Sequence, residues 1–362
     1  MCYNKGKIWA ESPKEGPPMP DTIYSAARIF PAIPLKFDSP EVCVSSAEGR
    51  SEGTLAPIDA WSSTDYLDIS GHYGLVYELH ANYRVRSAAF FDAEKRYLSG
   101  IGISGGCDHS GRAAALSGFC RVPDGAVYAR FVRFAGSERR FPIPVPLVCA
   151  IPDRDAYDRF AARFPFHDKK IACIGDSLTE GDYGYRYGIG YIYGYNFPFF
   201  LGRELGCHVD NYGVCGATSS QAFGDFAAGK SPVSDADVIT VMLGTNHGLD
   251  GKLGEDYLAL LDGIDAQKKP DAKIVLLTPP HVTSDPRRRS DNLHLAIAKA
   301  AGVVRRIAAE RGLEVIDALV YGPLQDGTEE FLQSNDGVHM TEQGYRAFAS
   351  FVRQQLVDRH LL

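Results

Sequence analysis

The chain has 362 residues, of which 45% are hydrophobic and 23% are charged, as is usual for globular proteins. Its formal net charge of -7 at pH 7 gives no overall basic face, so nucleic acid is not an expected partner. No apolar run reaches about 18 residues, so no membrane span is expected either. Because one core usually serves about 100–150 residues, we expect two domains.

The first twenty residues contain four prolines and several charges, which predicts an irregular arm over residues 1–20. They lack the apolar segment of a secretory signal. We therefore expect a cytoplasmic protein, one released by another route, or a signal that lies outside this sequence. The eight cysteines form no C-x-x-C motif, which argues against structural zinc. We interpret most of them as buried or incidental thiols, although an even number leaves disulfides open.

Short apolar runs separated by turn residues predict a β-sandwich over residues 21–150. The candidate strands cover residues 67–69, 74–79, 88–91 and 126–134. Residues 127–131 alternate apolar and polar side chains, as a half-buried strand does. Turn signals at Asp92, Ser99-Gly100 and Pro123-Asp124-Gly125 separate these runs.

Four prolines between residues 141 and 152 argue against a regular helix or a central strand there. We place the boundary between the two domains in this region. Residues 151–166 are predicted to be a linker with a short helix over about 155–164.

Residues 167–362 alternate buried apolar runs with helical periodicity, which predicts an α/β domain with a mostly parallel sheet covered on both faces. The expected strands are residues 171–174, 208–212, 238–243, 274–278 and 314–318. The expected helices are residues 196–205, 255–267, 291–311 and 341–356, the last with Thr341 as N-cap.

Four segments rich in glycine and polar side chains lie where strands of this sheet end. They are residues 175–181, 213–218, 244–246 and, between the last strand and the last helix, 336–339. Sites in open parallel sheets form at the carboxyl ends of the strands, so these segments are predicted to converge.

The residue types in these segments suit acyl transfer. Ser177 is the candidate nucleophile, His339 its general base, and Asp336 the acid that orients the imidazole. Donors for a developing oxyanion are the backbone N–H groups of Ser177 and Gly216 and the side-chain amide of Asn246. The alternative interpretations are a turn serine, a histidine at a helix start, and turn or capping roles for the others.

This set of motifs resembles the SGNH/GDSL hydrolase superfamily over about residues 167–356. The family's name motif is Gly175-Asp176-Ser177-Leu178, and its other blocks are similar to residues 211–216, 244–246 and 336–339. The resemblance implies a three-layer α/β/α domain with esterase or lipase activity and no metal or other cofactor. Two departures, His247 and Ala217, stand where the family often has aspartate, and they affect the expected substrate preference.

The N-terminal half resembles the jelly-roll accessory domains that precede such hydrolases in carbohydrate esterases. Together with a tyrosine-rich loop, this favours an O-acyl, above all O-acetyl, carbohydrate as substrate, from a small molecule or a glycan. The candidate substrate-binding residues are Asp176, His247, Tyr183, Tyr185 and Tyr187.

Other interpretations of the same sequence stay open. The tyrosines could instead pack their own loop onto the protein. A lipid esterase or acyl-thioesterase could use the same triad, and a catalytically silent carbohydrate-binding or structural protein is a further alternative. The sequence leaves the oligomeric state open.

Overall fold

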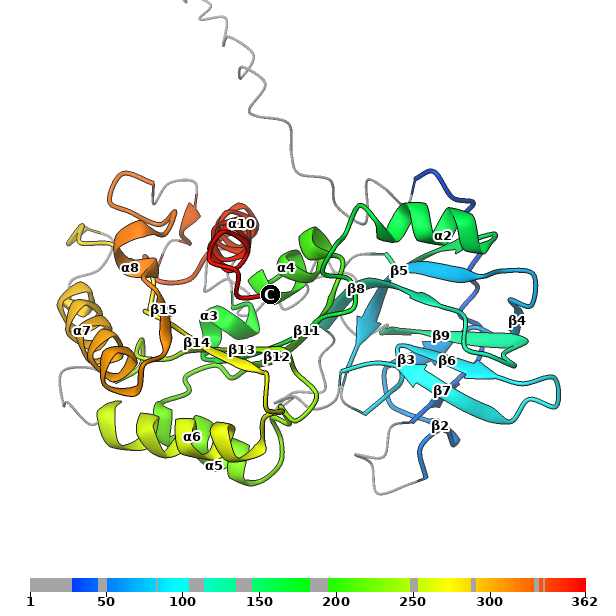
Figure 1. Ribbon diagram of the computed structural model, residues 1–362, viewed down its shortest axis with the longest axis horizontal. Coiled ribbons are helices and arrows are strands. Elements are labelled where there is room, and N and C mark those ends of the chain that lie inside the picture. The colour runs from blue at the N-terminus through cyan, green and yellow to red at the C-terminus, as the bar shows by residue number, and fades with distance from the viewer. Residues whose placement is uncertain are drawn as a thin grey trace, which may run out of the picture.

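The computed structural model describes residues 28–44, 51–82, 84–103, 114–134, 145–182, 195–247, 253–287, 291–328, 332–334 and 336–362. The predicted arm of residues 1–20 lies outside this part of the chain. In Figure 1 a strand-rich part, coloured blue to cyan, lies beside an α/β part, coloured green to red.

The N-terminal part consists of antiparallel sheets, as the apolar runs predicted. Its strands are β1 (Glu41–Cys43), β2 (Leu55–Pro57), β3 (Trp61–Ser63), β4 (Leu67–Asp68), β5 (Gly74–Ala81), β6 (Ala88–Phe91), β7 (Tyr97–Ile101), β8 (Ala114–Arg121), β9 (Tyr128–Phe134) and β10 (Leu147–Ile151). One sheet has the order β10-β5-β8 and another β3-β9-β6-β7, with β4 also paired to β9. Side chains of both sheets share one core, including Leu75, Phe90, Phe131 and Val148.

One turn predicted in this part is wrong. Ser99 and Gly100 are not a turn but belong to β7, where they pair with Phe90 and Ala89 of β6. Pairing between strands outweighs the weak local preference of Ser-Gly for turns. The proline-rich segment contains a strand, β10, which Pro146 and Pro152 flank. This strand lies at the edge of its sheet, in keeping with the prediction that no central strand forms there.

The predicted short helix forms as α2 (Arg154–Ala161), which begins where the Asp153 side chain accepts the N–H of Ala156. Phe160 of this helix packs against Val76 and Phe119 of the β10-β5-β8 sheet. The helix in the predicted linker is therefore anchored on the N-terminal part.

The C-terminal part is built on a five-stranded sheet with the order β12-β11-β13-β14-β15, all parallel. The strands are β11 (Lys170–Gly175), β12 (His208–Gly213), β13 (Val238–Met242), β14 (Lys273–Leu277) and β15 (Glu314–Ile316). The five predicted strands are thus confirmed. The order of the first three strands creates a topological switch point beside β11, where α/β sheets place their sites.

Helices cover both faces of this sheet (Figure 1). On one face lie α4 (Phe197–Leu205) and α10 (Glu342–Asp358), and on the other α5 (Ser219–Ala227), α6 (Leu253–Gln267) and α7 (Leu293–Arg311). Alternate residues of β11 serve the two cores: Cys173 faces the first and Ala172 the second. Two short helices, α3 (Ser177–Glu180) and α8 (Ala318–Tyr321), complete the part.

The two halves contact each other through α4 and β8. Ala115 of β8 packs against the core beneath α4 and α10, and Arg203 Nε of α4 lies 3.0 Å from Glu78 Oε1 of β5. Both charged side chains are largely buried, so the pair is shielded from solvent screening.

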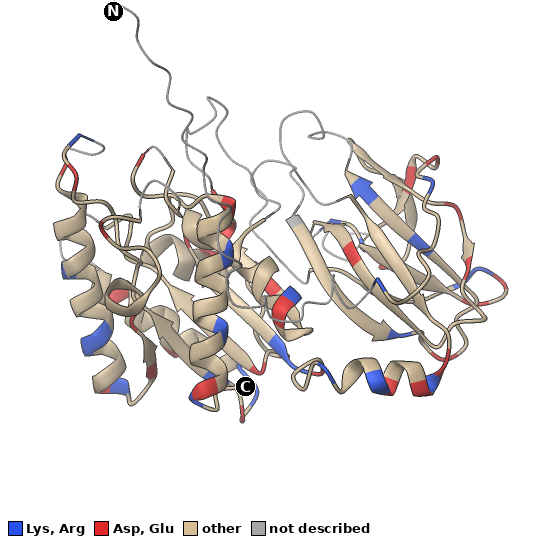
Figure 2. Cartoon of the chain, turned by 90° about the horizontal axis from the view of Figure 1, so that it is seen from above, with Lys and Arg blue, Asp and Glu red and all other residues tan. Residues whose placement is uncertain are grey.

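Acidic and basic side chains are interspersed over both halves (Figure 2). Among the described residues, no helix is long and apolar enough to cross a bilayer. The described cysteines are all free thiols: Cys43, Cys120, Cys149, Cys173, Cys207 and Cys215.

Candidate active site

The nucleophile candidate lies at the switch point of the sheet. Ser177 lies two residues after the end of β11 and is the first residue of α3, which Asp176 caps by accepting the N–H of Leu178 at 3.0 Å. The end of β12 lies very close to this helix, since a Cβ added at Gly213 would lie 2.1 Å from the backbone N of Glu180. Asn211 ties the two segments together by donating to the carbonyl of Thr179 at 2.9 Å.

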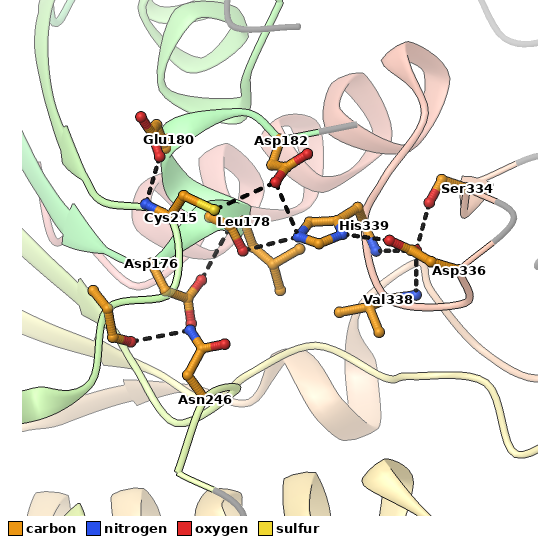
Figure 3. A network of polar contacts seen from close by, with 12 residues as sticks. Asp176, Leu178, Glu180, Asp182, Cys215, Asn246, Ser334, Asp336, Val338 and His339 are labelled. Carbon is orange, nitrogen blue, oxygen red and sulfur yellow. Dashed lines mark hydrogen bonds and ion pairs between the residues drawn. The ribbon is translucent and has the colours of Figure 1, made fainter. Parts of the chain in front are cut away.

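The structure brings Ser177, His339 and Asp336 into one hydrogen-bonded series (Figure 3). His339 Nε2 lies 2.9 Å from Ser177 Oγ, and His339 Nδ1 lies 2.6 Å from Asp336 Oδ2. With the Nδ1 proton donated to the carboxylate, Nε2 is left to accept the serine proton.

The loop that carries Asp336 holds the carboxylate in place. Asp336 Oδ1 accepts the Ser334 hydroxyl at 2.5 Å and the backbone N–H groups of Val338 and His339 at 2.9 and 3.0 Å. Its other oxygen is therefore directed at the imidazole. The histidine precedes α10, whose predicted N-cap Thr341 accepts the N–H of Gly344 at 3.0 Å.

Burial and charge act in opposite directions on this pair. Burial disfavours the imidazolium form of His339, but the hydrogen bond that His339 donates to Asp336 and the charges of Asp182, Asp336 and Asp176 raise its pKa. Burial also opposes ionisation of Asp336, yet its hydrogen bond with His339 holds the pKa of the carboxyl well below its usual range. Asp336 therefore stays ionised while His339 titrates.

A cavity of ≈ 360 Å³ opens beside Ser177 and His339. Cys215, Gly216, Thr245, Asn246, Leu293 and Val338 form the rest of its lining. The predicted nucleophile, base and oxyanion donors thus surround one cavity, as the strand-end rule indicated.

All three candidate oxyanion donors have an N–H group available. Among the described residues, no acceptor binds the backbone N–H of Ser177 or of Gly216. Gly216 has a φ of +75°, a conformation that suits glycine. The Asn246 amide donates one N–H to the Ala217 carbonyl at 3.0 Å and carries a second N–H.

Two predicted substrate-binding residues do not line the cavity. Asp176 is completely buried, and burial raises the pKa of its carboxyl to about 6. A side chain without exposed surface cannot touch a ligand in the cavity, so this placement argues for a supporting role under the nucleophile helix. His247 Nε2 instead accepts the backbone N–H of Ser219 at 3.0 Å at the start of α5. Tyr183, Tyr185 and Tyr187 lie outside the described residues.

Asp182 is a residue beside the catalytic series that the sequence analysis missed. The Oδ2 atom of Asp182 lies 3.5 Å from His339 Nε2 and 3.5 Å from Cys215 Sγ. Asp182 as a whole residue is only 2% exposed to solvent. The available signal was a carboxylate five positions after the nucleophile, directly behind Gly181, which ends α3.

A hydroxyl, an imidazole and a carboxylate in hydrogen-bonded order, at the switch point of a parallel α/β sheet, define the class of serine hydrolases. Residues 173–347 match the model of the GDSL-like Lipase/Acylhydrolase family. This part of the chain is therefore a GDSL-like lipase/acylhydrolase domain, and the predicted resemblance of the C-terminal half to that family is confirmed.

Several solved structures are similar to this half. The lipase/acylhydrolase from Enterococcus faecalis is 24% identical, with 53% of this chain and 96% of that chain covered and a TM-score of 0.43. The M. Smegmatis aryl esterase is 19% identical, covering 54% and 100%, with a TM-score of 0.44. A carbohydrate acetylesterase family member from Sinorhizobium meliloti is 21% identical, covering 54% and 99%, with a TM-score of 0.43. No curated protein matched the chain.

Proposed function

We propose that this protein is a serine esterase that removes short O-acyl groups, above all acetyl groups, from carbohydrates. The observation that carries the esterase mechanism is the series Ser177–His339–Asp336 at the wall of a small cavity. The cavity volume lies near the lower end of the range for ligand pockets, which supports a short acyl group.

The reaction follows from the atoms in contact. His339 Nε2 takes the proton of Ser177 Oγ as this oxygen forms a bond to the ester carbon. The carbonyl electron pair moves onto oxygen, and when it returns the bond to the alkoxy group breaks. The alkoxy oxygen takes the proton from His339 and leaves an acyl-serine. Water then repeats these steps, releasing the acid and free Ser177.

The oxyanion of the tetrahedral intermediate is assigned to the N–H groups of Ser177 and Gly216 and the amide of Asn246. Replacing Asn246 by alanine is expected to lower kcat by about 10²–10³-fold, because one preorganised hydrogen-bond donor to the oxyanion is lost. Steady-state kinetics with p-nitrophenyl acetate checks this, and kcat and kcat/KM should fall together.

Asn246→Asp serves as a second variant, since it keeps the size of the side chain and replaces the N–H donor with a negatively charged carboxylate. A rise in KM with unchanged kcat in both variants would contradict the oxyanion role of Asn246.

The apolar wall of the cavity offers a test of acyl length. Leu293 contributes to this wall, whereas Leu295, two residues further along α7, is 56% exposed. Wild type is expected to prefer acetyl over longer p-nitrophenyl esters. The ratio of kcat/KM for the acetyl ester to kcat/KM for the butyryl ester should be about tenfold lower in Leu293→Ala than in wild type. The reason is that one methylene in an apolar pocket changes kcat/KM by about 10–200-fold.

Leu295→Ala is the control and should leave the ratio unchanged. A wild-type preference for chains of about eight carbons or more would favour the lipid esterase or acyl-thioesterase and rule out the acetyl preference.

The carbohydrate part of the proposal rests on the strand-rich N-terminal half and on the tyrosines of residues 183–195. Tyr195, the one tyrosine of that run within the described residues, stacks on Phe200 of α4 at 5.9 Å between ring centroids. Tyr195 therefore packs on the protein, as expected if these tyrosines hold their own loop in place and do not bind sugar. An acetate-release screen over acetylated sugars and glycans, with Ser177→Ala as the blank, tests this part directly.

A further inference from the structure

Two carboxylates flank the imidazole of His339 on opposite sides (Figure 3). Asp336 lies at Nδ1, and Asp182 Oδ2 lies 3.5 Å from Nε2, the nitrogen that also contacts Ser177. The side chain of Asp182 is only 3% exposed, so water screens its charge little.

We propose that Asp182 is a positioning residue that acts through His339 by stabilising the protonated imidazole from its Nε2 side. The proposal deepens the proposed function, because the protonated imidazole forms each time Ser177 or water attacks the ester.

The charge of Asp182 distinguishes the two states of the histidine. In the neutral state the Nε2 lone pair accepts the serine hydroxyl. Nε2 then has no hydrogen to donate, so a nearby carboxylate oxygen forms no favourable interaction with it. In the protonated state Nε2 carries a hydrogen and positive charge, and attraction to a carboxylate at 3.5 Å is strong in a shielded site. Asp182 therefore favours the state that arises during catalysis.

The groups around the imidazole come from three segments. Asp336 belongs to the same loop as His339, and Asp182 and the buried Asp176 belong to the segment that carries Ser177. The Cys215 thiol contacts Asp182 from the loop after β12. The negative charges all raise the pKa of His339. Asp182 is the carboxylate among them that stands at Nε2, where the proton is exchanged with substrate.

The backbone of Asp182 is held by a contact that is independent of its carboxylate. Tyr345 of α10 donates its hydroxyl to the backbone carbonyl of Asp182 at 2.6 Å, a contact that does not need the side chain. The thiol of Cys215 is a weak donor at 3.5 Å. Asp182→Asn keeps the shape and the backbone contact and removes the charge.

The test compares the pH dependence of kcat/KM for p-nitrophenyl acetate in wild type and Asp182→Asn. The raised pKa of His339 moves the acid limb of wild type to a higher pH than an unperturbed histidine would give, since the base must be neutral to act. Asp182→Asn is expected to move this limb to lower pH and to lower the plateau by about threefold to thirtyfold, because a weaker base remains. Asp182→Glu should retain the wild-type limb more closely.

The same titration is followed by NMR of histidine-labelled protein, with His339→Gln to assign the signal. The His339 midpoint should fall in Asp182→Asn and in a second neutral variant, Asp182→Ser, and stay unchanged in Cys215→Ala. An unchanged His339 midpoint in a folded neutral variant overturns the proposal. This NMR measurement needs no turnover, so it tests the role of Asp182 even if wild type hydrolyses no ester. Absence of ester hydrolysis by wild type would instead contradict the proposed function.

Discussion

Ser177→Ala is expected to lower kcat for p-nitrophenyl acetate by about 10⁵–10⁶-fold, as loss of a triad nucleophile does in serine hydrolases. The hydroxyl at 2.9 Å from His339 Nε2 is the atom that would bond to the ester carbon, and alanine leaves nothing to form the acyl-enzyme. The cavity and the other donors remain, so weak binding and a small residual rate are expected.

Labelling with a fluorophosphonate provides the second measurement for this variant, because the probe forms a bond only with an activated serine. Wild type and Ser284→Ala should be labelled and Ser177→Ala should not. Ser284 is a matched serine, exposed and bonded to Asp326 at 2.7 Å. Labelling that persists in Ser177→Ala would place the nucleophile elsewhere, and its absence in wild type would favour the catalytically silent alternative.

His339→Ala is expected to lower kcat by about 10⁴–10⁶-fold, since the serine hydroxyl is a weak nucleophile without its base. The imidazole also returns the proton to the leaving alkoxy group, so its loss affects both halves of the reaction. The measurement is steady-state hydrolysis of p-nitrophenyl acetate, with folding confirmed by the thermal midpoint.

His281→Ala is the matched control for the base. His281 contacts a carboxylate as His339 does, with Nε2 at 2.8 Å from Asp326, but it does not line the cavity. Its variant should retain wild-type turnover. Near-normal turnover in His339→Ala would remove the histidine from the mechanism.

The α/β half was predictable because its signals are local. The strands β11, β13 and β14 of the parallel sheet are mostly apolar runs, and α10 shows its helical stripe and its N-cap Thr341 in the sequence itself. The strand-end rule then indicated where Ser177 and His339 would meet, although they are 162 residues apart.

The missed elements depend on contacts between distant segments. β7 and β10 contain turn-forming or proline-flanked residues, and pairing with β6 and β5 makes them strands. The nine residues of α5 were not recognised as a helix, although Thr218 caps the helix by accepting the N–H of Gln221 at 3.3 Å. Local propensity is too weak to decide such short elements.

The parallel α/β architecture could be inferred from the chain alone, and so could the serine, histidine and asparagine at the cavity and the aspartate behind the histidine, because strand ends and motif spacing are local features of a sequence. Three other features could be known only from the folded chain: Asp182 lies 3.5 Å from the imidazole, Asp176 is buried, and His247 contacts Ser219. These outcomes are side-chain directions and distances of a few ångströms, and they follow from packing between segments, which no one-dimensional pattern contains.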